Sequence, residues 1–214
     1  MAITLENAEE SFTSTQMINK KTILFGLAFF GILAIIVYPT KFGRKIRQKT
    51  KMELLGTGLI QPKIEPNSLK AEEIGFNYEG SLLSIKGIPI KLEDFKGKTL
   101  FINIWASWCG PCRAEMPYIN SLYEKLQENQ NVEFLMIAID EDFEKSKNYI
   151  SGKNFIFPVY HAFEGLNSSL DTKSIPMTVV VNAEGKVIFK DKGMNNFDTE
   201  DFRTFLLTQR KTSK

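Results

Sequence analysis

Two cysteines separated by two residues are the side chains in this sequence best suited to chemistry. Cys109 and Cys112 stand in the run Trp108-Cys109-Gly110-Pro111-Cys112, and the chain has no other cysteine. Thiol–disulfide exchange needs one thiolate that attacks and a second thiol that releases the mixed disulfide. A bridge between residues this close constrains little of the unfolded chain and adds little stability. The spacing therefore favours a redox role for the pair.

The residues around the pair predict that it lies where a buried strand leads into a helix. Thr99–Trp105 reads as a buried strand, and a helix is expected from the dithiol to about Glu128. Unpaired N–H groups and the positive end of the dipole at a helix start stabilise a thiolate, and thiols in such motifs reach pKa values of about 3.5–7.5. We expect Cys109 to be the attacking, solvent-facing sulfur and Cys112 the buried resolving thiol. Pro111 suits the first turn of the helix, where its missing N–H costs nothing.

A zinc site is the alternative interpretation of two cysteines at this spacing. Zinc needs four ligands, usually from further cysteines or histidines, and the chain offers only His161. We therefore expect no metal and no cofactor other than the redox-active disulfide itself. The net charge of +2 over 214 residues gives no basis for a nucleic-acid partner, which would need a basic stripe or patch.

The elements that would position the dithiol follow from apolar runs and turn residues. Leu82–Ile85 and Ile88–Leu92 predict a hairpin at a sheet edge, where Pro89 is tolerated. Strands alternating with helices imply an α/β sheet with helices on its faces. The remaining strands are expected at Val132–Ile139, Phe155–Tyr160, Met177–Val181 and Lys186–Lys190, and the remaining helices at Asp142–Ser151 and from a cap at Asp198 to about Gln209.

The N-terminal part of the chain differs in character from this domain. Residues 1–21 form a polar tail, and residues 22–38 form an uncharged apolar run that would span about 25 Å as a helix, at the short end of the range for a bilayer. A cleaved signal peptide is the rival interpretation, but Val37-Tyr38-Pro39-Thr40 is a poor cleavage site. We expect a transmembrane anchor at 22–38, a linker at 39–72 punctuated by glycine and proline, and the α/β domain at 73–214.

A family resemblance rests on the dithiol motif and its flanks. Trp105-Ala106-Ser107-Trp108-Cys109-Gly110-Pro111-Cys112 resembles the active-site segment of the thioredoxin superfamily. Arg113-Ala114-Glu115-Met116-Pro117 and the upstream Ile90–Lys98 resemble the membrane-anchored TlpA/ResA-like branch, the thiol:disulfide interchange proteins. The match covers roughly residues 74 to 210. It implies a thioredoxin-like α/β fold with an N-terminal β-hairpin extension and a central insertion at about 141–174, preceded by one transmembrane helix.

The resemblance also implies roles for particular residues. Ile175-Pro176 matches the cis-proline loop that holds the substrate chain by backbone contacts, and Pro117 matches the proline that kinks the active-site helix. Glu115 matches an acidic residue that tunes thiol protonation, although a solvated helix-face charge is the alternative. Asn103 stands where soluble thioredoxins carry a buried aspartate, which favours the anchored branch. Met177 replaces a common threonine.

The aromatic and small residues of the motif suit a docking rim. Trp108 is expected on the surface, and Trp105 is equally consistent with an apolar collar or with the core. The inner pair Gly110-Pro111 resembles that of reducing family members, although it does not settle the direction of electron flow. A flat apolar rim around an exposed sulfur would suit an extended cysteine-containing segment.

The function that these features imply is that of a membrane-anchored thiol–disulfide oxidoreductase. It would reduce disulfides in cysteine-containing extracytoplasmic proteins and be re-reduced by a membrane thiol–disulfide electron donor; a role in cytochrome c maturation is a family possibility that no residue selects. The alternatives are a peroxidase-type redoxin, whose Pro-x-x-x-Thr/Ser-x-x pattern is absent before Cys109, and a non-catalytic docking or chaperone module.

The side of the membrane is disputed by the charges that flank the apolar run. The positive-inside rule would place the domain in the cytoplasm, although long domains translocate with little regard to flanking charge. The resemblance implies a single-pass protein of the cell membrane with its catalytic domain periplasmic or otherwise extracytoplasmic. Only Lys20 and Lys21 precede the run, and it is followed by Lys41, Arg44, Lys45, Arg47, Lys49 and Lys51.

Overall fold

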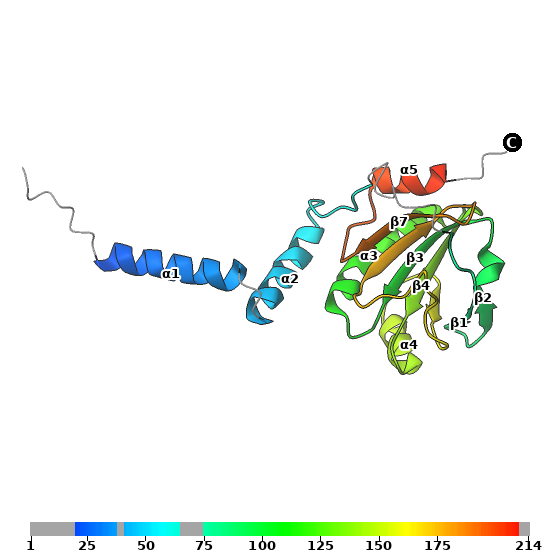
Figure 1. Ribbon diagram of the computed structural model, residues 1–214, viewed down its shortest axis with the longest axis horizontal. Coiled ribbons are helices and arrows are strands. Elements are labelled where there is room, and N and C mark those ends of the chain that lie inside the picture. Colours follow the sequence, from blue (N-terminus) through cyan, green and yellow to red (C-terminus); the bar gives the residue numbers. More distant parts are fainter. Residues whose placement is uncertain (1–19, 38–40, 65–74, 210–214) are drawn as a thin grey trace, which may run out of the picture. The chain divides into compact units, whose positions relative to one another are not determined.

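The computed structural model describes residues 20–37, 41–64 and 75–209 (Figure 1). The chain divides into two compact units, Met1–Thr50 and Lys51–Lys214. Helix α1 covers Lys20–Val37 and helix α2 covers Lys41–Leu55. None of the helices in the described ranges combines the length and the apolar character that crossing a membrane requires. The transmembrane anchor expected at 22–38 is therefore not confirmed, and Tyr38 lies outside the described residues.

Part of the predicted linker has regular structure and packs into the domain. Helix α2 lies within the linker expected at 39–72, and its closely spaced basic residues obscured its apolar side in the sequence. Leu55 at the end of α2 is only 1% exposed, and the backbone N–H of Asn196 donates to the carbonyl of Ile60 at 3.0 Å. Gly58, read as a breaker, closes the turn that follows the helix with a φ of 75°. Residues 65–74 lie outside the described residues.

A seven-stranded mixed sheet organises the C-terminal unit, in the order β2-β1-β5-β4-β3-β6-β7. The central β3 runs parallel to β4 and antiparallel to β6, and all seven of its residues are buried, as its largely apolar run predicts. The strands are β1 Ser81–Ser84, β2 Pro89–Lys91, β3 Thr99–Trp105, β4 Val132–Ala138, β5 Val159–His161, β6 Met177–Val181 and β7 Val187–Lys192.

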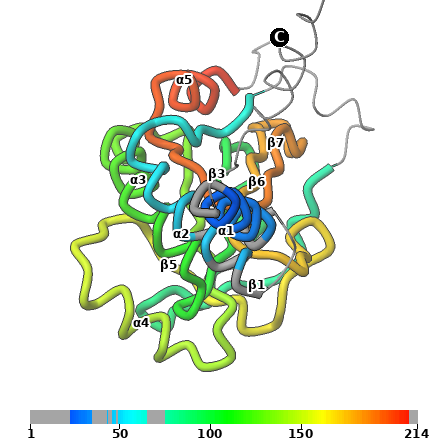
Figure 2. The backbone as a smooth tube through the Cα atoms, turned by 90° about the vertical axis from the view of Figure 1, so that its left-hand side faces the viewer, coloured from blue at the N-terminus to red at the C-terminus, as the bar shows by residue number. Residues whose placement is uncertain are grey.

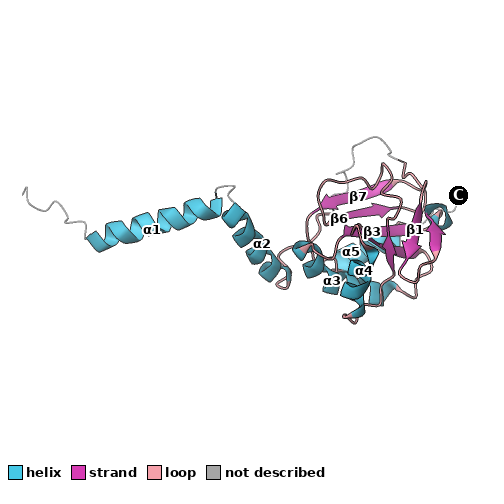
Figure 3. Cartoon of the chain, turned by 90° about the horizontal axis from the view of Figure 1, so that it is seen from below, coloured by secondary structure: helices cyan, strands magenta, loops and turns pink. Residues whose placement is uncertain are grey.

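The two faces of the sheet are covered differently. Successive side chains of β3 point to opposite faces, so Phe101 packs with α3 (Gly110–Leu126), α4 (Phe143–Ser151) and α5 (Glu200–Thr208). Figure 3 shows these three helices gathered together against the strands. The other face, with Ile102, lies under the hairpin residue Leu82, the 3₁₀ turn at Leu92–Phe95 and the loop residue Leu170. The alternation of strands and helices predicted α-helices on both faces. In the described residues, α3, α4 and α5 all cover one face, and the 3₁₀ turn is the only helical element on the other.

Most element positions agree with the sequence, with two shifts at element ends. The hairpin β1–β2 lies at the edge of the sheet with Pro89 in its outer strand, as predicted, whereas β5 begins four residues later than expected. Asp198 does not cap the last helix. The side chain of Thr199 accepts from the N–H of Phe202 and is the cap, because the Asp198 carboxylate instead accepts from the Ser121 hydroxyl at 2.7 Å.

Replacing Leu55 by alanine tests whether the segment after α2 belongs to the domain. Because the side chain is fully enclosed, the variant Leu55→Ala should lower the free energy of unfolding by about 3 kcal/mol. Urea denaturation of the full chain measures this difference. Leu59, in the same segment and 77% exposed, is the matched control, and Leu59→Ala should leave stability nearly unchanged. Equal effects of the two substitutions would contradict the packing.

Candidate active site

The two cysteines form a disulfide at the first turn of α3. The S–S distance is 2.00 Å and the Cα atoms are 5.3 Å apart. Cys109 is the N-cap residue, and its Sγ accepts a hydrogen bond from the backbone N–H of Cys112 at 3.2 Å. Cys109 is 5% exposed and Cys112 is fully buried, so the described sulfur nearer to solvent is the one expected to attack. Pro111 lies in the first turn of the helix, where no backbone donor is lost.

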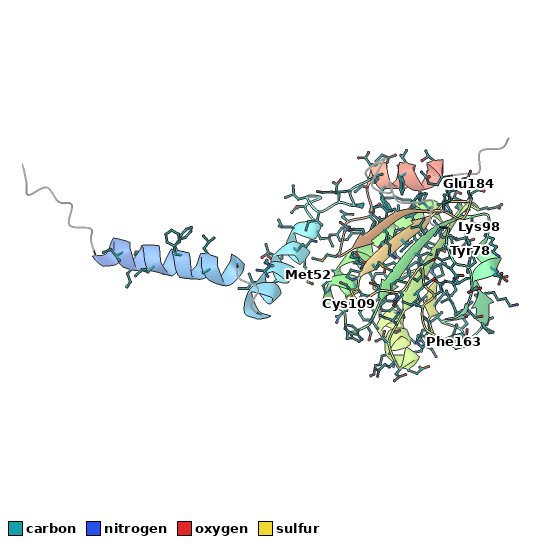
Figure 4. All side chains as sticks on the ribbon, viewed as in Figure 1. Met52, Tyr78, Lys98, Cys109, Phe163 and Glu184 are labelled. Carbon is teal, nitrogen blue, oxygen red and sulfur yellow. A yellow bond between two sulfur atoms is a disulfide. The ribbon has the colours of Figure 1, made fainter. Side chains whose placement is uncertain are left out.

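The loop that carries the dithiol is held by a buried carboxylate at the end of the neighbouring strand. Asp140, after β4, accepts from the N–H of Ser107 at 2.9 Å and from its hydroxyl at 2.6 Å, while the Ser146 hydroxyl of α4 donates at 2.5 Å. The N–H of Cys109 donates to Ala106 at 3.0 Å. The sequence analysis did not predict a role for Asp140. Parallel strands end at the same edge of a sheet, so an acidic residue shortly after β4 could have been expected near the end of β3. Figure 4 shows Cys109 at the opposite end of the domain from Lys98.

The two tryptophans of the motif have different environments. Trp108 is 68% exposed beside the dithiol, as expected for a docking rim. Trp105 is fully buried, packs against Tyr149 of α4 at 5.9 Å between ring centroids, and its indole N–H has no hydrogen-bond partner among the described residues. Trp105 is therefore part of the core rather than of a collar.

The proline loop reaches the same edge of the sheet. The Ile175–Pro176 peptide bond is cis, and Met177 begins β6 opposite Ile104 of β3. The carbonyl of Pro176 accepts from the N–H of Gly193 at 2.9 Å. The backbone N–H and C=O of Ile175 have no hydrogen-bond partner within the part of the chain that the structure describes. These two groups are therefore available to an incoming extended chain.

Glu115 lies inside the protein rather than on a solvated helix face. Its carboxyl is fully buried one helical turn after Cys112, where Oε1 accepts from the Asn103 amide at 2.8 Å and Oε2 accepts from the N–H of Asn195 at 3.2 Å. The Asn103 amide also donates to the Thr178 hydroxyl at 3.0 Å. The signal for this burial is the helical spacing, which puts Glu115 on the face of α3 with Cys112, Met116, Ile119, Leu122 and Leu126.

Burial raises the pKa of Glu115 to about 8, and the hydrogen bonds from Asn103 and Asn195 offset only part of that effect. The carboxyl is therefore largely protonated at neutral pH. Residues at positions i and i+3 of a helix are neighbours on its surface, so the Glu115 carboxyl lies on the same buried side of α3 as the Cys112 sulfur. The arrangement allows Glu115 to exchange a proton with the sulfur that must lose one when it attacks. Asn195 and Thr178 complete the network and were not foreseen, because each lies far along the chain from the motif.

Replacing Glu115 by glutamine should change how stability depends on pH. The folded-state pKa of Glu115 is raised from 4.5 to about 8. The neutral carboxyl therefore makes its full contribution to the free energy of unfolding below about pH 4.5, and this contribution is lost as the pH rises through about 8. Glutamine cannot ionise, so the free energy of unfolding of the variant should rise relative to that of the wild-type protein by about a few kcal/mol over this pH range. Urea midpoints of the oxidised proteins at about pH 5 and about pH 9 measure the difference. Parallel loss of stability in both proteins would show that Glu115 is ionised when folded. The exposed Glu124 of α3, changed to glutamine, is the control.

Comparisons with known proteins agree with this geometry. The redoxin family model matches residues 76–206. The chain is 38% identical over 112 residues to the thiol-disulfide oxidoreductase ResA of Bacillus thuringiensis, covering 51% of this chain and 63% of that protein. It is 33% identical over 103 residues to the ResA of Bacillus subtilis, covering 48% and 57% of the respective chains. The match thus spans less than two thirds of the length of these relatives.

A solved structure resembles the same region. The thiol:disulfide interchange protein of the thioredoxin family from Chlorobium tepidum superposes with a TM-score of 0.54, at 26% identity, over 64% of this chain and 99% of that chain. The thioredoxin-like α/β fold expected from the sequence is confirmed. The chain belongs to the redoxin family, as a thioredoxin-like protein that resembles the TlpA/ResA branch.

Proposed function

We propose that this protein is a thiol–disulfide oxidoreductase that reduces disulfides in cysteine-containing proteins outside the cytoplasm. The observation that carries the proposal is the Cys109–Cys112 disulfide at the start of α3, with one sulfur near solvent and the other enclosed. A bridge that closes so short a loop stabilises the fold little. Its position at a helix N-terminus instead favours the thiolate that exchange requires.

The reaction proceeds in two exchange steps. In the reduced protein, the Cys109 thiolate attacks one sulfur of the substrate disulfide, which forms a mixed disulfide and releases the other substrate sulfur as a thiolate. Cys112 then loses its proton and attacks Cys109 Sγ, which forms the intramolecular disulfide and releases the second substrate thiol. Two electrons pass from the protein to the substrate. Glu115, one helical turn after Cys112 in α3, would accept or return the Cys112 proton, and the structure corresponds to the oxidised product.

Substrate binding is assigned to the surface around Cys109. The exposed indole of Trp108 supplies apolar contact area next to the sulfur. The unpaired backbone groups of Ile175 offer one donor and one acceptor to an extended chain, in the manner of an added strand. An apolar ring and main-chain groups make contacts that do not depend on one substrate sequence, which suits unfolded or loosely folded cysteine-containing segments. Apocytochromes c are one substrate class of this kind.

We further propose that the apolar segment at 22–38 holds the chain at the cell membrane, with a membrane thiol–disulfide donor that re-reduces the pair. The support comes from the described side chains of α1, which are apolar and exposed. Exposed apolar patches of this kind mark sites of membrane or protein interaction. These side chains are Ile23, Leu24, Phe25, Leu27, Phe29, Phe30, Ile32 and Leu33.

Replacing Cys112 by serine should trap substrates on Cys109. The variant retains the attacking thiol but has no sulfur to release the mixed disulfide, so covalent complexes should accumulate in cells. Non-reducing electrophoresis after acid quenching detects them, and a reductant should dissolve them. The variant Cys109→Ser keeps only the buried thiol and should capture almost nothing. Absence of mixed disulfides from Cys112→Ser, while Cys109 still reacts with an alkylating reagent, would refute the exchange reaction.

Reporter fusions after Lys51 test the side of the membrane. Alkaline phosphatase is active only where disulfides form, so an extracytoplasmic domain predicts high phosphatase activity and a dark green-fluorescent-protein fusion. Removal of residues 22–38 from the same fusions should abolish the phosphatase signal. The reverse pattern, with bright fluorescence and an inactive phosphatase, would place the domain in the cytoplasm.

A further inference from the structure

The loop after β7 connects three parts of the domain that are distant in sequence. The N–H of Gly193 donates to the carbonyl of Pro176 in the cis-proline loop, and the N–H of Asn195 donates to Glu115 Oε2. The next N–H, of Asn196, donates to the carbonyl of Ile60 in the segment after α2. One short loop therefore touches the buried acid and the proposed substrate-binding loop at once, so its position affects both.

A side-chain clamp fixes this loop. Asn195 is 7% exposed, and its amide donates to the Asp191 carboxylate at 2.6 Å and to the carbonyl of Gly193 at 3.4 Å. Asp191 lies on β7 opposite Thr178, the residue whose hydroxyl accepts from Asn103. Gly193 has a φ of 121°, a conformation that side chains disfavour, so the turn itself depends on glycine. Asp191 is thus the charged end of the arrangement that presents the Asn195 N–H to Glu115.

Two opposite charges act on Glu115 from outside its own helix. The Asp191 carboxylate raises its pKa and the Lys51 ammonium lowers it, while the neighbours from β3 and β6 are the neutral Asn103 and Thr178. Asp191, Asn195 and Lys51 line one cavity of about 540 Å³ beside β7. The other charged groups that line this cavity are Lys63, Lys190 and Lys192.

We propose that Asp191 is a positioning residue of the dithiol site, which acts on Glu115 through the Asn195 clamp and through its own charge. Lys51 of α2 opposes that charge. The consequence for turnover rests on the proposed function, because it requires the Glu115 proton to serve Cys112. The positioning itself concerns only Glu115 and its neighbours. The protonation of the buried acid is therefore set partly from a cavity that is separate from the surface around Cys109.

Titration of the Glu115 carboxyl carbon by NMR, on the full chain in the oxidised and the reduced states, tests the proposal. Asp191→Asn keeps a side-chain acceptor for Asn195 but removes the charge, so the midpoint should fall by about half a pH unit. Asn195→Ala loosens the loop and weakens the N–H bond that favours the ionised form, so the midpoint should rise. Lys51→Gln removes the opposing charge and should also raise it.

Matched variants separate positioning from a general loss of structure. Asp191→Glu keeps the negative charge, so the midpoint of the Glu115 titration should stay close to the wild-type value. Asp201→Asn removes an exposed acid on α5 and should leave the midpoint unchanged. A merely structural role would lower the urea midpoint of unfolding in Asp191→Asn without moving the Glu115 titration.

The outcomes distinguish this proposal from the proposed function. Unchanged Glu115 midpoints in Asp191→Asn and Asn195→Ala would overturn the positioning role, whatever the protein does to disulfides. Shifted midpoints in a protein that traps no substrate through Cys109 would support the positioning and reject the exchange reaction. In an active protein, the pH at which Cys112 resolves a mixed disulfide should follow the Glu115 midpoint in Asp191→Asn.

Discussion

The complete burial of β3 is the constraint on which the rest of the domain depends. Its side chains alternate between two cores, one built with the helices and one built under the hairpin. The strand therefore cannot slip by one residue without exchanging both cores. That fixed register determines where the chain emerges at Ala106, and with it the position of Cys109. Hydrogen bonds from Ser107 to Asp140 then hold the short connection into α3. Figure 2 traces the backbone of β3 and of α3, the two elements that this connection joins.

The same strand places a polar group where the core would otherwise be apolar. Asn103 faces the helix side between Phe101 and Trp105 and supplies the donor for the Glu115 carboxyl. Burying an ionisable group is costly unless it becomes neutral or gains partners, and here both occur, since the pKa is raised while two donors remain. The Asn103 carbonyl oxygen is buried with no partner among the described residues. A proton on Glu115 is thus the feature that makes the network tolerable in the oxidised state.

Structural elements that depend on residues close together in the sequence could be predicted, and contacts between distant segments could not. The dithiol at a helix start follows from the apolar run before Cys109 and from Pro111 after it, so its placement needs only local rules. The hairpin at the edge follows from Pro89 in the same way. Asn195 is different, because its N–H reaches Glu115 only through the β6–β7 pairing, which no local spacing encodes. Helix α2 was missed since its charges hide the residue, Leu55, that packs into the domain.

The limited exposure of the dithiol has a kinetic consequence. Only the edge of Cys109 is open, and Cys112 has no access of its own, so in the proposed exchange reaction electrons would enter and leave through a single opening. In the proposed reaction, a thiol donor and a disulfide acceptor would therefore occupy the same surface beside Trp108, one after the other, and each would inhibit the other at high concentration. The chain would store one pair of electrons in its two sulfurs and pass them on in alternating half-reactions, so the proposed reaction predicts ping-pong kinetics with competition between the two partners.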